Sequence, residues 1–188
     1  SVVYPEVPFN STSVPFIGAP PVWGDDLGIG TDLNGLGVSI GIIDTGIDYQ
    51  HTQFGGSGVL ADYMANDRTV APDAYFPSAK VVGGTDFAGD TYNASGNGGT
   101  TGSTTPVPDA DPMDCNRHGT HVAGTAAGLG VNSDGTTFAG PWDATTPFAS
   151  MRIGPGVAPR ASLYALRVFG CQGSTSLTAQ AIEWATDP

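Results

Sequence analysis

Two short segments carry residue types that work together in proton transfer. The first, residues 38–48, is an apolar run that ends in Asp44 and a glycine turn. The second, residues 114–124, places His118 at the start of a stretch of small residues. A buried aspartate that accepts the Nδ1 proton of a histidine fixes the tautomer of the ring and stabilises the imidazolium. The pair therefore predicts two of the three members of a Ser-His-Asp relay.

Each residue alone also allows a different interpretation. Asp44 in an isolated Asp-Thr-Gly could cap a turn, and aspartic proteases use the same tripeptide. His118 and His121 could bind zinc, but their i, i+3 spacing lacks the usual glutamate and a third ligand. The N-terminus of a helix disfavours a protonated ring, so we expect His118 to be available as a base near neutral pH.

No convincing nucleophile motif accompanies this pair before the last residue, Pro188. Ser150 precedes a methionine, but it lacks the Gly-Thr that leads into a nucleophile turn and a helix that follows it. We interpret residues 148–151 as a loop. The sequence thus indicates a Ser-His-Asp relay but contains no recognisable motif for its serine.

Composition excludes several classes of partner. Six basic and eighteen acidic side chains give the 188 residues a net charge of -12, which argues against binding to nucleic acid. No apolar run approaches the 18 residues that a membrane-spanning helix needs. The abundance of Gly, Ser, Thr and Pro is typical of a loop-rich secreted protein, and the acidic surface leaves room for calcium.

The remaining pattern predicts an α/β architecture with parallel crossovers. We expect strands at 38–44, 80–83 and 161–168, helices at 118–128 and 176–186, and long loops at 89–112 and 130–156. Residues 1–37 read as an extended arm with one short helix. In the last helix, Leu177, Ala181, Trp184 and Ala185 share one face, and Ser174, Thr175 or Ser176 can cap its start.

Taken together, these segments resemble the subtilisin-like serine proteases (subtilases). The resemblance rests on three blocks in the family's order: 36–51, 114–128 and 154–185. It implies a three-layer, mostly parallel doubly wound sheet of subtilisin type, incomplete in this chain. Residues 38–188 would be the N-terminal part of the peptidase domain, with a loop insertion at about 54–114.

The resemblance also implies roles for individual residues. Asp44 would be the catalytic aspartate and His118 the general base, with Asp114 and Asn116 beside it and Asn116 also in contact with the substrate. The segment that pairs with the acyl side of the substrate corresponds to Gly173, Ser174 and Thr175, with Phe169 and Leu177 as subsite walls. An exposed edge of this kind is a template for an extended peptide.

The two cysteines, Cys115 and Cys171, are either buried thiols or a disulfide, and the secreted-like composition favours the disulfide. Some secreted subtilases carry the same pattern, which implies a Cys115–Cys171 bridge. Two departures from the family stand out. Arg117 replaces a small residue and would lower the pKa of His118 if it stays close. Residues 51–53 replace His-Pro-Asp, whose aspartate ligates calcium in several relatives, so that site is not carried over.

The sequence therefore predicts a secreted serine endopeptidase that acts on protein or peptide substrates. This chain supplies Asp44 and His118, and the serine lies on a missing downstream segment or a second chain, so the chain alone is inactive. The partner is the remaining C-terminal part of its own domain. No cofactor is required for the chemistry, although structural calcium is possible. The alternative is a non-catalytic peptide-binding module on a protease-like scaffold.

Overall fold

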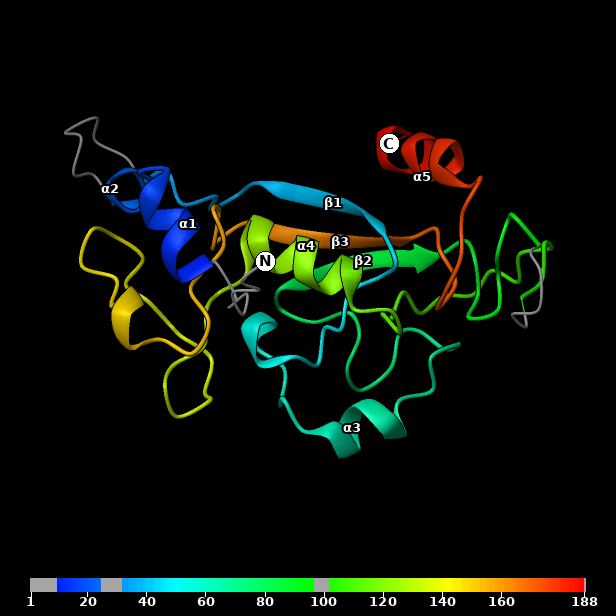
Figure 1. Ribbon diagram of the computed structural model, residues 1–188, viewed down its shortest axis with the longest axis horizontal. Helices are drawn as coiled ribbons and strands as arrows, with labels where there is room; N and C mark the ends of the chain where they lie inside the picture. The colour runs from blue at the N-terminus through cyan, green and yellow to red at the C-terminus, as the bar shows by residue number, and fades with distance from the viewer. Residues whose placement is uncertain (1–9, 25–31, 97–101, 188) are drawn as a thin grey trace, which may run out of the picture.

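A computed structural model describes residues 10–24, 32–96 and 102–187. Its centre is a parallel sheet of three strands in the order β1-β3-β2 (Figure 1). The strands are β1 (Ser39–Asp44), β2 (Val81–Asp86) and β3 (Ser162–Arg167). The α/β class is confirmed, and the strand boundaries differ from the expected ones by one to three residues.

Two helices cover opposite faces of this sheet. Side chains alternate along β3, so neighbouring residues of this strand pack against different helices. Leu163 and Ala165 belong to the cluster that includes Ala123 and Ala127 of α4 (His118–Ala127). Leu166 and the following Val168 instead pack with Ala181 of α5 (Thr178–Thr186). Figure 1 shows α4 and α5 on the two sides of the strands. Burial on both faces accounts for the continuous apolar sequence of these strands.

The carboxyl ends of all three strands meet at one edge. The register aligns Asp44 of β1 and Asp86 of β2 with Arg167 of β3. Because the strands are parallel, the turns that follow them start from the same edge, where sites form in open α/β sheets. This edge positions the candidate residues.

The remaining elements surround this centre. The N-terminal arm holds two short helices, α1 (Asn10–Phe16) and α2 (Pro20–Trp23), where one was expected; its residues 1–9 and 25–31 lie outside the described part. Val14 and Trp23 pack against Trp142 and Phe148, so the arm lies on the domain. The stretch 54–114 contains α3 (Leu60–Ala65) and β2. Short 3-10 helices cover Thr52–Phe54 and Phe148–Ser150.

One expectation about the last helix was wrong. Its N-cap is Leu177, without a side-chain cap, because the Thr175 hydroxyl accepts from the Leu177 amide one residue too early to cap the helix. Ala181 is buried, but Trp184 is exposed and lies beside Tyr164, with ring centroids 6.4 Å apart. Of the helices that the structure describes, none is long and apolar enough to cross a membrane.

Helix α4 approaches the end of β1 so closely that only glycine fits at the contact. A Cβ on Gly119 would lie 2.2 Å from the carbonyl oxygen of Gly46. Gly46 itself has a φ of 102°, in the left-handed region that favours glycine. These two glycines therefore allow the start of α4, and with it His118, to lie against the turn that follows Asp44.

This contact predicts that Gly119→Ala lowers the free energy of unfolding by about 1–3 kcal/mol through overpacking. At a helix position with free space around it, the same change would stabilise the fold by about 1 kcal/mol. The sign of the change in the free energy of unfolding therefore tests the close contact. Urea denaturation measures it, with Thr125→Ala at an exposed position of α4 as the control. A Gly119→Ala protein as stable as the parent would contradict the close approach.

Candidate functional site

The structure brings the two candidate catalytic side chains together. His118 Nδ1 lies 2.7 Å from Asp44 Oδ1, and because a carboxylate only accepts, Nδ1 donates. Asp44 Oδ1 also accepts from the Thr45 amide at 2.7 Å. The Asp44 side chain is 14% exposed, and the His118 side chain is 67% exposed. The aspartate thus holds one edge of a ring whose other edge faces outward.

The protonation of His118 differs from the sequence-based expectation. Its pKa is raised above the usual value of 6.5, first by the hydrogen bond to Asp44, then by the charges of Asp44 and Asp114. The helix N-terminus was expected to lower this pKa, and Arg117 to lower it if it stayed close, but the net shift is a rise. The hydrogen bond and the charge of Asp44 are the largest causes of the rise, and Arg117 is exposed to screening solvent, with a left-handed φ of 84°.

Asp114 organises the chain around the histidine. Its carboxylate is buried, with the residue 2% exposed, and accepts five hydrogen bonds. The donors are the amides of Asn116, Arg117 and Thr120 and the hydroxyls of Thr45 and Thr120. The first turn of a helix has amides with no partner inside the helix; Asp114 accepts from that of Thr120, and the amides of Asn116 and Arg117 just before α4 also donate to it. One buried carboxylate therefore fixes the turn that delivers His118.

Thr45 connects this turn to the end of β1. Its hydroxyl donates to Asp114 Oδ1 at 2.9 Å and accepts from the Gly119 amide at 2.8 Å. Thr45 directly follows Asp44, and Gly119 directly follows His118. A single threonine hydroxyl thus sets the relative position of the two candidate catalytic residues.

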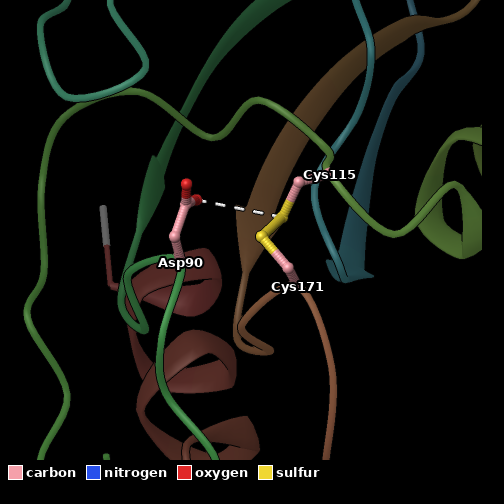
Figure 2. A group of neighbouring side chains, drawn as sticks. All are labelled: Asp90, Cys115 and Cys171. Carbon is pink, nitrogen blue, oxygen red and sulfur yellow. Dashed lines mark hydrogen bonds between the residues drawn. A yellow bond between two sulfur atoms is a disulfide. The ribbon is translucent and has the colours of Figure 1, made fainter. Parts of the chain in front are cut away.

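A disulfide joins the histidine turn to the expected substrate edge. Cys115 and Cys171 are bonded, with their Cα atoms 5.1 Å apart (Figure 2). Beside this bond, Asn116 Nδ2 donates to the carbonyl oxygen of Cys171 at 2.9 Å. Asn116 therefore lies between the two segments, and its amide connects them.

Arg167, which is fully buried, anchors the same region. Its guanidinium lies 2.9 Å from Asp86 and 2.9 Å from Asp90, donates to Cys115 Sγ at 3.0 Å, and donates through Nε to the Phe169 carbonyl. The Asp86 contact is an ion pair without hydrogen-bond alignment. Burial raises the pKa of Asp86 to about 6, and the charge of Arg167 opposes that rise.

Asp90, Cys115 and Cys171 form the one group among the described residues whose donor atoms could converge on a metal. Asp90 Oδ1 lies 3.8 Å from Cys115 Sγ, and Figure 2 draws this contact. Both sulfurs are consumed by the disulfide, and the guanidinium of Arg167 occupies the space beside them. This arrangement fits a cross-link, not a metal centre.

The expected substrate edge presents free backbone groups. Ser174 uses both of its own, because its amide donates to Asn93 Oδ1 at 3.1 Å and its carbonyl accepts from the Ala94 amide at 2.9 Å. By contrast, no described residue pairs with the Gly173 carbonyl or the Thr175 amide. The Thr175 hydroxyl donates to the Val168 carbonyl, which ties the edge to the end of β3.

The two expected subsite walls lie beneath this edge. Phe169 and Leu177 are half-buried and pack against the cluster of Phe87, Leu166, Val168 and Ala181. Part of each side chain supports the edge from the protein interior. A role as subsite walls stays a prediction.

The turn after β1 is shaped by its own polar residues. Asp48 Oδ1 accepts from the Gln50 amide, and His51 Nδ1 accepts from the Gln53 amide, each at 3.1 Å. The Gln53 side-chain amide donates to the Thr120 carbonyl at 3.4 Å.

A cavity of about 540 Å³ lies beside α4. It is lined in part by Asp48, His51, Arg117 and His121, and its lining does not include Asp44 or His118.

Comparison with known proteins places these segments in one family. A model of the subtilase family matches residues 35–188. Subtilisin DY from Bacillus licheniformis is 34% identical over 155 residues, covering 81% of this chain and 34% of the relative. Minor extracellular protease Vpr from Bacillus subtilis is 31% identical over 168 residues, covering 89% of this chain and 14% of the relative.

Among solved structures, the crystal structure of a cold-adapted subtilisin-like serine proteinase matches at 25% identity with a TM-score of 0.39. That match covers 81% of this chain and 33% of the other. The chain therefore spans between 14% and 34% of the length of these three proteins.

The geometry predicts that Asp44→Asn lowers the pKa of His118 towards 6.5, because the amide removes the charge that favours the imidazolium. In the parent, the pair stabilises the fold fully below the unfolded pKa near 6.5, and this stabilisation is lost as pH rises through the higher folded pKa. An NMR titration of the His118 ring measures the shift.

Two comparisons accompany this titration. Arg117→Ala is the control, and we expect it to leave the pKa of His118 nearly unchanged because the guanidinium is exposed. The signal of His121 provides an internal reference in every variant. An Asp44→Asn protein whose His118 titrates like the parent would contradict the hydrogen bond.

Proposed function

Because the chain belongs to the subtilase family, we propose that it supplies the aspartate and the histidine of a serine endopeptidase. A serine hydroxyl attacks the peptide carbonyl, and His118 Nε2 takes its proton and later gives it to the leaving amine. Asp44 holds the ring and stabilises the imidazolium. The observation that carries the proposal is the 2.7 Å contact of Nδ1 with Asp44 on a ring that is otherwise exposed.

The proposal places the serine outside these 188 residues, on a downstream segment or a second chain. In support, no described serine hydroxyl bonds to His118, and the Ser150 hydroxyl donates to the Pro147 carbonyl. The chain alone is then inactive, and its main partner is the remaining part of its own catalytic domain.

The substrates are proteins or peptides that lie extended along the edge at 173–175. The Gly173 carbonyl and the Thr175 amide, which pair with no described residue, offer one acceptor and one donor to such a backbone. Strand addition to an exposed edge gives affinity through main-chain hydrogen bonds. The edge is joined to the histidine turn by the Cys115–Cys171 bond, so a bound peptide lies at a fixed distance from His118.

Catalysis in this family needs no cofactor. A structural calcium ion accords with the acidic composition, but Gln53 replaces the aspartate that ligates calcium in several relatives, so that site is not proposed here. We place the protein outside the cell, since disulfides such as Cys115–Cys171 persist in oxidising compartments.

The proposal predicts that a protein joining residues 1–188 to a serine-bearing segment hydrolyses peptides, and that Asp44→Asn reduces kcat by about 10⁴-fold. A fluorophosphonate probe followed by peptide mapping should label one serine outside 1–188. Asp67→Asn, at an exposed aspartate, is the matched control and should leave both readouts unchanged.

The result that contradicts the proposal is a folded protein with neither hydrolysis nor labelling. If that protein still binds extended peptides, the chain is a binding module on a protease-like scaffold. Hydrolysis that survives both Asp44→Asn and His118→Ala would also contradict it, because the reaction would then use other groups.

A further inference from the structure

Behind the substrate edge, the side chain of Asn93 contacts Ser174. Ser174 lies between the Gly173 carbonyl and the Thr175 amide, which have no described partners. Asn93 lies in the segment between β2 and α4, and is only 8% exposed. Its Oδ1 accepts from the Ser174 amide at 3.1 Å, the Ser95 amide at 3.2 Å and the Ser174 hydroxyl at 3.3 Å. The backbone N–H of Asn93 donates to the Ser103 carbonyl at 2.8 Å, which holds the backbone at this point.

The neighbours of Asn93 complete the contact. The Ala94 amide donates to the Ser174 carbonyl, so both backbone groups of Ser174 face the 93–95 segment. The Ser95 amide donates to the Ser174 hydroxyl at 3.0 Å, and the two serine hydroxyls also bond to each other. Ser174 is thereby bonded on one side only, and the Gly173 carbonyl and Thr175 amide on either side of it are left without described partners.

The shape of the contact leaves little room for movement. A Cβ on Gly173 would lie 2.3 Å from Asn93 Cγ, so the side chain of Asn93 packs directly against the backbone of the edge. Gly173 also has a φ of 103°, a conformation that other residues adopt at a cost. The path of the edge therefore depends on what stands at position 93.

We propose that Asn93 is a positioning residue for the substrate: it holds Ser174 so that the backbone groups of Gly173 and Thr175 are presented to an extended peptide. This role rests on the proposed peptidase function. It concerns only the residues that precede the cleaved bond, because only they reach the edge. The proton relay of Asp44 and His118 does not pass through Asn93.

The segment 90–95, which contains Asn93, is itself held at its first residue, Asp90. The Cys171 amide donates to the Asp90 carbonyl at 2.9 Å, three residues before Asn93. The Asp90 carboxylate pairs with the buried Arg167 at 2.9 Å. Tyr92 OH bonds to Ser176 Oγ at 2.9 Å on the far side of the edge. The segments 90–95 and 171–176 thus lie alongside each other, and Asn93 is in the middle of their contact.

The test uses the active protein that carries these residues and two substrates with the same residue at the cleaved bond. One is a blocked tetrapeptide anilide that spans the edge, and the other is a blocked single-residue ester that does not reach it. Asn93→Ala should raise KM for the tetrapeptide by about tenfold, equivalent to about 1.4 kcal/mol, with kcat unchanged. The ester should be hydrolysed as by the parent.

Asn93→Asp keeps the accepting oxygens and should restore most of the tetrapeptide KM. Asn132→Ala, which removes a loop asparagine bonded to Thr136 away from the edge, is the matched control. A parent that cleaves neither substrate would overturn the proposed function and this role together. A parent that cleaves both, with an Asn93→Ala variant that keeps the tetrapeptide KM or loses both activities equally, would overturn the role of Asn93 alone.

Discussion

The buried carboxylate of Asp114 is the interaction on which the rest of the site depends. It accepts five hydrogen bonds, and three of the donors are amides in the turn and first residues around His118. A buried donor left without a partner costs about 1–3 kcal/mol, so removing this carboxylate would destabilise the turn. Through the Thr45 hydroxyl, the same carboxylate fixes the end of β1. The contact of Asp44 with His118 is the consequence.

A second set of contacts ties the substrate edge to this turn. The Cys115–Cys171 bond is covalent, and Arg167 lies beside it with its charge matched by Asp86 and Asp90. Removing one partner of a buried ion pair is far more costly than the pair is stabilising, which favours keeping the whole group. The histidine, the edge and the ends of β2 and β3 therefore form one connected structure.

The sequence predicted the parts of this site that are local. Asp44 ends an apolar strand and His118 begins a helix of small residues, and both features lie within short segments. It did not predict the roles of Asp114 and Arg167, because their partners lie far along the chain: Thr45 and Asp114 are 69 residues apart. A charged residue inside the apolar run at 161–168 was the available signal for Arg167, since a buried charge requires partners.

Errors in the prediction have the same origin. The sequence reveals a helix N-terminus at His118 but not the 2.7 Å distance to Asp44, so the direction of the pKa shift was wrong. β2 extends to Asp86, three residues beyond the expected end at Gly83, because Gly84, Thr85 and Asp86 pair with β3, a contact between distant parts of the chain. The contact of Asn93 with Ser174 was not predicted, because the two residues are 81 positions apart in the sequence.

The most direct measurement of the central claim is the tautomer of His118, read from the ¹⁵N shifts of its ring at a pH above its pKa. The structure predicts a proton on Nδ1, donated to Asp44, and a bare Nε2 that is able to accept a proton from a serine. A ring protonated on Nε2 would mean that Asp44 does not hold the histidine, and would contradict the account.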